Sequence, residues 1–154
     1  MNISDLIDSR AVLANVKAPG KKQLLNELSN LMSRQTGIDA RSIFETMLRR
    51  EKLGSTGIGQ GIAIPHGKMG GLKKVHCLFA RLASPLEFDS ADGQPVDLVF
   101  MMLAPEDAGA DHLKALARIS RVLREGDTIS KLRGTDTPEG LYAILTEPRA
   151  ASAA

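Results

Sequence analysis

Apolar residues recur at helical spacing in two neighbouring segments of the chain. From Pro19 to Gly37, leucines and a methionine return every three or four residues, and the segment from Asp39 to Gly54 repeats this design. Such spacing places the apolar side chains on one face of a helix, and glycine commonly follows the last helical residue. We therefore predict two amphipathic helices that end at Gly37 and Gly54.

Three later segments have the pattern of strands. Residues 75–82 are rich in apolar and aromatic side chains, and residues 96–103 are apolar at nearly every position. A strand without a polar face is buried on both sides, so residues 96–103 are expected in the middle of a covered sheet. A shorter strand is predicted to end at Pro65 and His66, and the turn-rich residues 84–95 leave room for an edge strand.

Helical spacing returns in the last third of the chain. A long helix is predicted after Pro105, with Asp111 as its N-cap and Gly126 at its end. Two short helices follow, and in the second of them Thr137 is expected to cap the helix while Pro138 occupies its first turn. This order of elements indicates a single α/β domain with helices on both faces of a central sheet.

Composition fits an ordinary globular domain and disfavours several classes of function. The 154 residues are 43% hydrophobic and 25% charged, and the net charge of +2 includes no dense block of lysine and arginine. With one Tyr and four Phe to stack on bases, nucleic-acid binding is not expected. The sequence has no long apolar run and no signal-peptide pattern, and its single Cys77 cannot form an internal disulfide. We expect a cytoplasmic protein without membrane insertion.

The segment "GSTGIGQGIAIPHGK", residues 54–68, contains five glycines and no carboxylate. It does not match a nucleotide loop, which needs Gly-Lys-Ser/Thr at the start of a helix or G-x-G-x-x-G between a strand and a helix. A metal site is not favoured, because His66, His76, His112 and Cys77 lack the spacings of zinc ligands. We therefore expect neither a cofactor nor a metal, and we interpret His76 and Cys77 as structural residues on opposite faces of one strand.

His66 is the candidate for chemistry in this segment. A proline precedes it and Gly67 follows it, and this combination can hold a side chain on an exposed loop. A neutral imidazole is a nucleophile that can accept a phosphoryl group. The transferred phosphoryl group is negatively charged, so it needs hydrogen-bond donors around it and no carboxylate to repel it. As donors the segment offers its glycine amides, Ser55, Thr56 and Lys68. From the residues alone, a functional site and a tight turn both remain open.

The same segment resembles the phosphorylation-site signature of phosphotransferase-system enzyme IIA proteins of the mannitol/fructose class, and within it the nitrogen-regulatory branch. The resemblance extends to "LRREKLGSTG", to "QPVDLVFMMLAPEDAGADHLKALARISRVL" and to "TPEGLYAIL". It implies an enzyme IIA domain at residues 3–147, with a central mixed β-sheet of about five strands flanked by helices on both faces. The small and polar residues 148–154 are expected to form a frayed tail.

The resemblance also implies a phosphoryl-transfer site. The histidine of the family's "IPHG" signature is His66, which would accept a phosphoryl group on Nε2 from a histidine-containing phosphocarrier protein. The family's second histidine maps to His112, as a donor that stabilises the phosphoryl group, and its arginine maps to Arg50 rather than Arg49. Further candidates to line the pocket are Ser55, Thr56 and Gly67.

Three functions of different classes are compatible with these residues. The first is a regulator in a nitrogen-related phosphotransferase relay, which controls targets such as potassium-transport regulators or sensor kinases and turns over no small molecule on its own. The second is a sugar-specific enzyme IIA that passes phosphate to a IIB component during carbohydrate uptake. The third is a hydrolase or metal-binding enzyme, which would need a carboxylate such as Asp107 or Asp111 beside a histidine. We favour the first.

Overall fold

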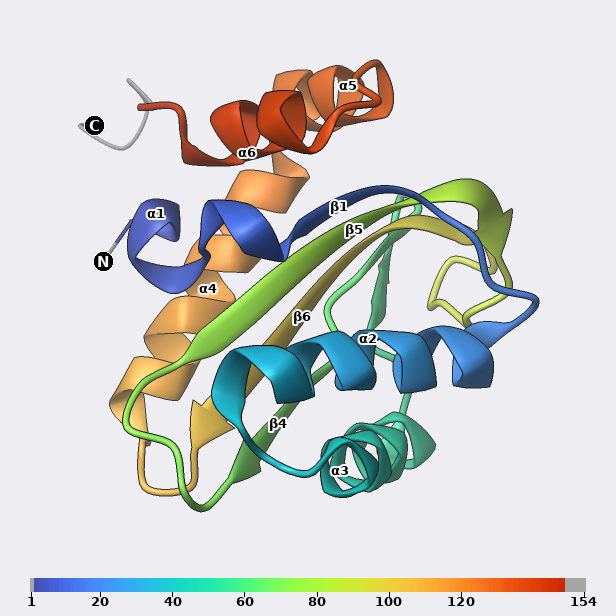
Figure 1. The fold of residues 1–154 in the computed structure, drawn as a ribbon. Coiled ribbons are helices and arrows are strands. Elements are labelled where there is room, and N and C mark those ends of the chain that lie inside the picture. The colour runs from blue at the N-terminus through green and yellow to red at the C-terminus, as the bar shows by residue number, and fades with distance from the viewer. Residues whose placement is uncertain (1, 149–154) are drawn as a thin grey trace.

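The computed structural model describes residues 2–148, which fold into a central sheet flanked by helices (Figure 1). Except for Pro148, the predicted tail at 148–154 lies outside the described residues. The helices are α1 (Ile3–Leu6), η1 (Ser9–Ala11, a 3-10 turn), α2 (Lys21–Thr36), α3 (Ala40–Leu53), α4 (Ala110–Arg124), α5 (Gly126–Arg133) and α6 (Pro138–Thr146). The strands are β1 (Val12–Val16), β2 (Gly57–Gly59), β3 (Ile62–Ala63), β4 (His66–Met69), β5 (His76–Leu86) and β6 (Val96–Pro105).

Strand β6 occupies the centre of the sheet. On one side it pairs antiparallel with β5, which pairs parallel with β1. On the other side β3 and β4 both run parallel to β6, and β2 pairs antiparallel with β3. Within residues 2–148 this makes one mixed sheet of six strands, in agreement with the expected mixed sheet of about five. Every residue of β6 except Asp97 is buried, which confirms that this apolar segment lies in the middle of a covered sheet.

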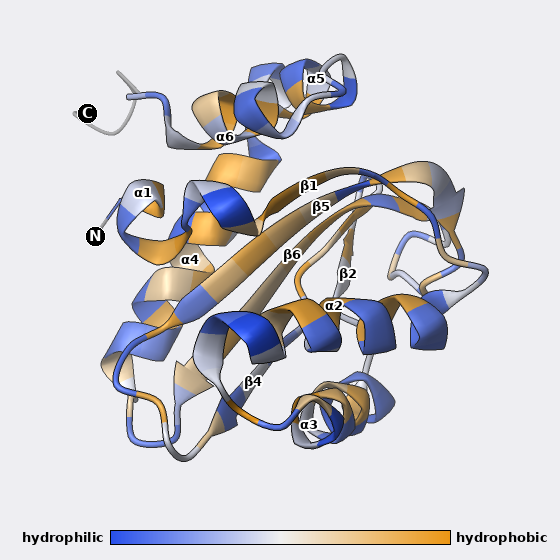
Figure 2. Ribbon diagram, in the orientation of Figure 1, coloured by the Kyte–Doolittle hydropathy of each residue, from blue (hydrophilic) through white to orange (hydrophobic). Residues whose placement is uncertain are grey.

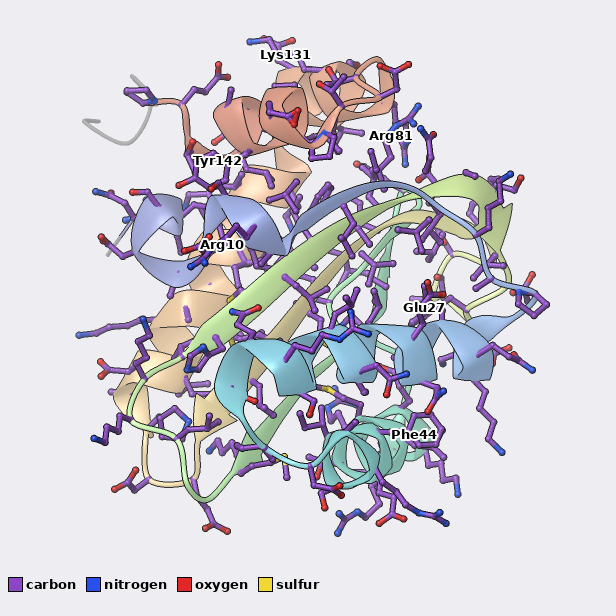
Figure 3. The ribbon with its side chains drawn as sticks, viewed as in Figure 1. Arg10, Glu27, Phe44, Arg81, Lys131 and Tyr142 are labelled. Atoms are coloured by element: carbon purple, nitrogen blue, oxygen red, sulfur yellow. The ribbon has the colours of Figure 1, made fainter. Side chains whose placement is uncertain are left out.

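Helices cover both faces of the sheet. The pair α2 and α3 lies on one side, and α1, α4, α5 and α6 gather on the other (Figure 1). The helices present apolar residues toward the strands and polar residues outward (Figure 2). Side chains fill the space between the helices and the sheet (Figure 3). Arg81 projects from β5 toward α5 and donates a hydrogen bond to the Arg133 carbonyl over 2.7 Å.

Three of the predicted helix boundaries are confirmed. Helix α2 ends before Gly37, whose φ of 79° lies in the left-handed region that favours glycine, and α3 ends before Gly54. Thr137 accepts a hydrogen bond from the Gly140 amide over 3.1 Å and caps α6, with Pro138 in the first turn. Local sequence signals therefore set these ends.

The predicted ends of the long helix are wrong. Helix α4 begins at Ala110 with Gly109 as its N-cap, so Asp111 lies inside the first turn. The turn after β6 needs a positive φ at this point, and Gly109, at 50°, adopts it without the steric cost of a β-carbon. At the other end α4 stops at Arg124, and Gly126 is the first residue of α5.

The strand around His66 also differs from the prediction. Strand β3 ends at Ala63, and pairing with β6 resumes at His66, which begins β4 instead of ending a strand. Pro65 has no amide hydrogen to contribute to the ladder, so the strand is interrupted there. The Pro65 carbonyl still accepts from the Met102 amide over 2.9 Å, which keeps the interrupted segment against β6.

Candidate functional site

Two of the three histidines meet where β4 and α4 begin. His66, the first residue of β4, pairs with Met102 of β6. Strand β6 then leads through residues 106–109 into α4, whose third residue is His112. The ring centroids of His66 and His112 are 5.7 Å apart, with an angle of 53° between the ring planes. The fold thus brings together two histidines that are far apart in the sequence.

A hydrogen bond fixes the tautomer of His66. Its Nδ1 lies 2.7 Å from the Ile64 carbonyl oxygen, and a carbonyl can only accept, so Nδ1 carries the hydrogen and Nε2 keeps its lone pair. Burial lowers the pKa of His66 below 6.5, the nearby Arg50 charge lowers it further, and the Ile64 hydrogen bond acts in the opposite direction. The ring is therefore neutral at neutral pH, with Nε2 available as a nucleophile.

His112 is a neutral partner for this ring. Its exposed fraction is 7%, and burial lowers its pKa, with smaller contributions from His66 and Lys68. Its Nδ1 has no hydrogen-bond partner among residues 2–148. Because His112 also lies in the first turn of α4, the positive end of the helix dipole is close to it. His112 can thus stabilise an anion on His66 without carrying a full charge itself.

An open hollow of about 720 Å³ is lined by both histidines. Three cationic side chains and one carboxylate lie along it, and this balance favours a bound anion. The cationic residues are Arg49, Arg50 and Lys68, the carboxylate is Glu106, and the other lining residues are Thr46, Leu53, His66, Gly67, Met69, Gly70 and His112. Of these, the sequence had offered the two histidines, Arg49, Arg50, Gly67 and, as a possible donor, Lys68, whereas Thr46, Leu53, Met69, Gly70 and Glu106 were not predicted.

Arg50 is better placed than Arg49 to act on His66. The Nη1 of Arg50 donates to the Gly54 carbonyl over 2.8 Å, and its charge contributes to the lowered pKa of His66. Arg49 is exposed, and its Nε reaches the Glu45 carbonyl at 3.5 Å. The geometry thus favours Arg50 as the cation beside the reactive ring.

Gly67 allows α3 to pack closely on β4. A β-carbon at this position would lie 2.8 Å from Cγ2 of Thr46, closer than two such carbons approach in proteins. A larger residue would push α3 away from the strand. Since α3 carries Arg50, the absence of a side chain at Gly67 helps to hold the arginine near His66.

Ser55 and Thr56 do not line the hollow. The Ser55 hydroxyl donates to the Phe88 carbonyl over 2.6 Å. The Thr56 hydroxyl donates to a carboxylate oxygen of Glu51, and the Thr56 amide donates to the other oxygen over 3.0 Å. Both hydroxyls are therefore bonded to protein oxygens.

Glu51 is a buried carboxylate that the sequence analysis missed. Its exposed fraction is 7%, and besides Thr56 it binds the Lys21 ammonium over 3.0 Å. It thereby joins the end of α3 to the start of α2 and to the glycine-rich segment. Glu51 follows the buried Ile43 and Met47 at intervals of four residues, and this spacing would have placed it on the inner face of the helix.

The histidines should make the stability of the fold depend on pH. Burial lowers the pKa of His66, His76 and His112 below 6.5. In acid the unfolded chain therefore binds more protons than the folded one, and the free energy of unfolding should fall as pH drops below about 6.5. Urea unfolding at about pH 7.5 and about pH 5.5 measures this change. In His112→Gln the decrease should be smaller, and an equal decrease would contradict the contribution of His112.

Other candidate chemistry finds little support in the described part of the chain. Among residues 2–148, no three His, Cys, Asp or Glu side chains are grouped in a way that could hold a metal ion. Cys77 is fully buried, and burial raises the pKa of its thiol far above neutral pH, so it is not a nucleophile. No described helix combines the length and apolar composition needed to cross a bilayer.

Known proteins share both this sequence and this fold. A family model described as phosphoenolpyruvate-dependent sugar phosphotransferase system, EIIA 2, matches residues 5–147. A nitrogen regulatory protein of Bradyrhizobium diazoefficiens is 52% identical over 153 residues, which cover 99% of this chain and 100% of that protein. The crystal structure of nitrogen regulatory protein IIA-Ntr from Neisseria meningitidis matches with a TM-score of 0.88 at 35% identity, over 94% of this chain and 99% of that one. The structure of IIA mannitol from Escherichia coli matches in fold, with a TM-score of 0.76 at 20% identity over 90% and 97% of the two chains. The chain therefore belongs to the EIIA 2 family of the phosphoenolpyruvate-dependent sugar phosphotransferase system.

Proposed function

We propose that this protein is a phosphoryl-accepting regulator of a nitrogen-related phosphotransferase relay. A histidine-containing phosphocarrier protein donates the phosphoryl group, and His66 accepts it on Nε2. The proposal rests above all on the hydrogen bond from His66 Nδ1 to the Ile64 carbonyl, which leaves Nε2 as the free nitrogen of a residue that lines the cationic hollow. The full-length similarity to a nitrogen regulatory protein supports the regulatory role.

The transfer exchanges one phosphorus–nitrogen bond for another. The lone pair of His66 Nε2 attacks phosphorus in the carrier's phosphohistidine, and the electron pair of the broken bond returns to the carrier's ring. The hydrogen stays on Nδ1, where it is donated to the Ile64 carbonyl. Nε2 has no hydrogen to lose, so His66 needs no general base. Arg50, Lys68 and His112 are among the lining residues that can donate hydrogen bonds to the phosphoryl oxygens.

Regulation follows from the change of charge. A phosphoryl group adds about two negative charges, which offset the excess of positive side chains around the hollow. This change controls binding to target proteins, such as potassium-transport regulators or sensor kinases, in the cytoplasm. The phosphoryl group stays on the protein until a partner takes it, so the protein is a relay component rather than an enzyme that turns over a small molecule.

The alternative is a sugar-specific enzyme IIA that passes its phosphoryl group to a IIB component. The same residues would perform the same chemistry, and the family description and the fold shared with IIA mannitol support this alternative. The higher identity to IIA-Ntr than to IIA mannitol favours the regulator. Deletion of the gene followed by growth on fructose and mannitol separates the two functions, because only the sugar component is needed for uptake.

Phosphorylation of the purified protein tests the proposal directly. With phosphoenolpyruvate and the general phosphotransferase enzymes, including the carrier, the protein should gain the mass of one phosphoryl group. The group should be labile in acid and stable in base, as expected for phosphohistidine. The carrier must be required, and the mass should not change when it is left out. A protein that stays unmodified in the complete system would overturn the proposal.

Replacement of the two arginines should separate their roles. Arg50→Gln should slow phosphoryl transfer from the carrier by about 10²-fold, because it removes a charged donor from the transition state. Arg49→Gln is the matched control on the same helix and should transfer at close to the wild-type rate. Quench-flow measurement of phosphoprotein formation gives both rates. A slow Arg49 variant together with a normal Arg50 variant would reverse the assignment.

A further inference from the structure

Two strongly exposed leucines lie beside the hollow of His66. Among residues 2–148, three large apolar side chains are exposed: Leu53 at 86%, Leu113 at 67% and Ile58 at 38%. Leu53 lines the hollow, and Leu113 directly follows His112, which also lines it. The two most exposed large apolar side chains of the described chain therefore belong to the surroundings of one site.

Leu53 lies on the side of α3 that faces the hollow. Thr46, Arg49, Arg50 and Leu53 all line it. The last three follow Thr46 by three, four and seven residues, a spacing that places all four on one face of a helix. Leu53 is also the last residue of α3, so no later turn of the helix covers it. Its side chain is thus presented to whatever enters the hollow.

Leu113 approaches the same region from the other layer of helices. Helices α3 and α4 pack on opposite faces of the sheet, and β4, which pairs only with β6 in the described part of the chain, forms the edge between them (Figure 1). The buried face of α4 begins with His112. Leu113 is rotated by about 100° from His112 around the helix, so it points away from the core. One exposed leucine therefore comes from each layer.

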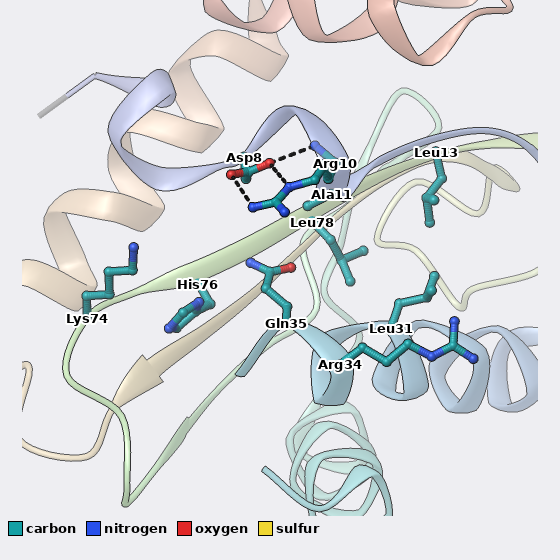
Figure 4. A pocket seen from close by; sticks show the side chains of 10 residues that line it. All are labelled: Asp8, Arg10, Ala11, Leu13, Leu31, Arg34, Gln35, Lys74, His76 and Leu78. Atoms are coloured by element: carbon teal, nitrogen blue, oxygen red, sulfur yellow. Dashed lines mark hydrogen bonds and ion pairs between the residues drawn. The ribbon is translucent and has the colours of Figure 1, made fainter. Parts of the chain in front are cut away.

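The second hollow of the molecule lacks this feature. It has about 550 Å³ and lies between the end of α2 and the strands β1 and β5 (Figure 4). Its apolar lining residues, Ala11, Leu13, Leu31 and Leu78, are buried or half-buried and pack into the core. None of these four protrudes into solvent as Leu53 and Leu113 do.

We propose that Leu53 and Leu113 are the apolar anchors that bind the phosphocarrier protein, through an apolar patch beside its phosphohistidine. This inference rests on the proposed function. His66 is half-buried in the wall of the hollow, so the carrier must place its own histidine inside the hollow for the transfer.

A docked carrier would cover both leucines. An interface of ordinary size buries about 800 Å² of each partner, enough to reach the helix ends that carry Leu53 and Leu113. Apolar side chains in the core of an interface supply much of the affinity, because they lose contact with water on binding. Neither leucine has a polar group to offer to the phosphoryl oxygens. Their contribution is therefore to the affinity for the carrier and not to the bond exchange.

The rate of phosphoryl transfer as a function of carrier concentration tests this assignment. Leu53→Gln and Leu113→Gln should each raise the concentration of phosphorylated carrier that gives half the maximal rate by about tenfold. The maximal rate should stay within about twofold of the wild type, as expected when only binding is lost. Leu31→Gln, on α2 in the second hollow, is the matched control and should behave as the wild type does. Glutamine has nearly the helix propensity of leucine, so all three helices should persist.

The outcomes separate this inference from the relay itself. A wild-type protein that accepts no phosphoryl group would overturn both. If the wild type is phosphorylated and both leucine variants reach half the maximal rate at the wild-type carrier concentration, the docking surface is wrong and the relay stands. An equally large change in Leu31→Gln would also contradict the assignment. Analytical ultracentrifugation of the same variants covers the remaining case. Loss of self-association with an unchanged dependence on carrier would assign the leucines to a contact between two copies of this chain and overturn the proposal.

Discussion

His66→Ala should take up no phosphoryl group from the carrier, whereas the wild-type protein should be fully labelled. Among the lining residues, His66 combines a neutral ring, a fixed tautomer and a free Nε2. His112 lies at 5.7 Å between ring centroids, but its exposed fraction is 7% and its Nδ1 has no hydrogen bond among residues 2–148 that would fix a tautomer, so it does not replace His66 as the acceptor. The loss should therefore be complete rather than partial, and mass spectrometry of the intact protein measures it.

Two other histidine variants serve as controls for this loss. His76→Ala removes a half-buried histidine from β5, which lies across β6 from His66, and it should be labelled as the wild type is. His112→Ala should still be labelled but more slowly, because it loses a donor and keeps the acceptor. Thermal unfolding shows whether each variant is folded. A folded His66→Ala that still gains an acid-labile phosphoryl group would place the acceptor at another residue.

Glu51→Gln should lower the free energy of unfolding by about 3–5 kcal/mol, because it removes one member of a buried ion pair. The carboxylate of Glu51 accepts hydrogen bonds from Lys21 and from both the amide and the hydroxyl of Thr56. A glutamine presents an NH₂ group to one of these donors and leaves the Lys21 ammonium without its counter-charge. Urea unfolding at neutral pH gives the change.

Glu45→Gln is the matched control, since it makes the same substitution on the same helix. Glu45 pairs with Arg41 one turn away, but its side chain is 56% exposed and that of Arg41 is 85% exposed. Exposed pairs of this kind contribute about 0.3–0.5 kcal/mol, so the control should be close to the wild type. Equal and small effects of the two substitutions would mean that Glu51 does not hold α2, α3 and the glycine-rich segment together.

The parts of the fold that the sequence predicted are those set by local signals. Gly37 and Gly54 end their helices, Thr137 caps α6, and the apolar residues 96–103 form the buried strand β6. Strand β1 was missed, because its five residues show no regular alternation and Asn15 has a positive φ of 55°. Such a strand is specified by its neighbour β5 rather than by its own pattern.

The candidate site was predicted only where the chemistry lies in a recognisable motif. His66 was a candidate from its own segment, His112 and Arg50 came from the resemblance to enzyme IIA proteins, and the fold brings all three to one hollow. The contributions of Thr46 and Leu53 depend on how α3 packs on β4, which periodicity does not encode. Ser55 and Thr56 were candidates as hydroxyl donors, but their bonds to Phe88 and Glu51 arise from contacts between distant segments.

The anchoring of His66 has a consequence for the speed of the relay. Its backbone pairs with Met102, and its ring is tied to the Ile64 carbonyl, so the nucleophile has a fixed orientation before any partner arrives. A preorganised nucleophile loses little rotational entropy on the way to the transition state. We therefore expect the bond exchange to have a small unfavourable activation entropy, which the temperature dependence of the transfer rate at excess carrier measures.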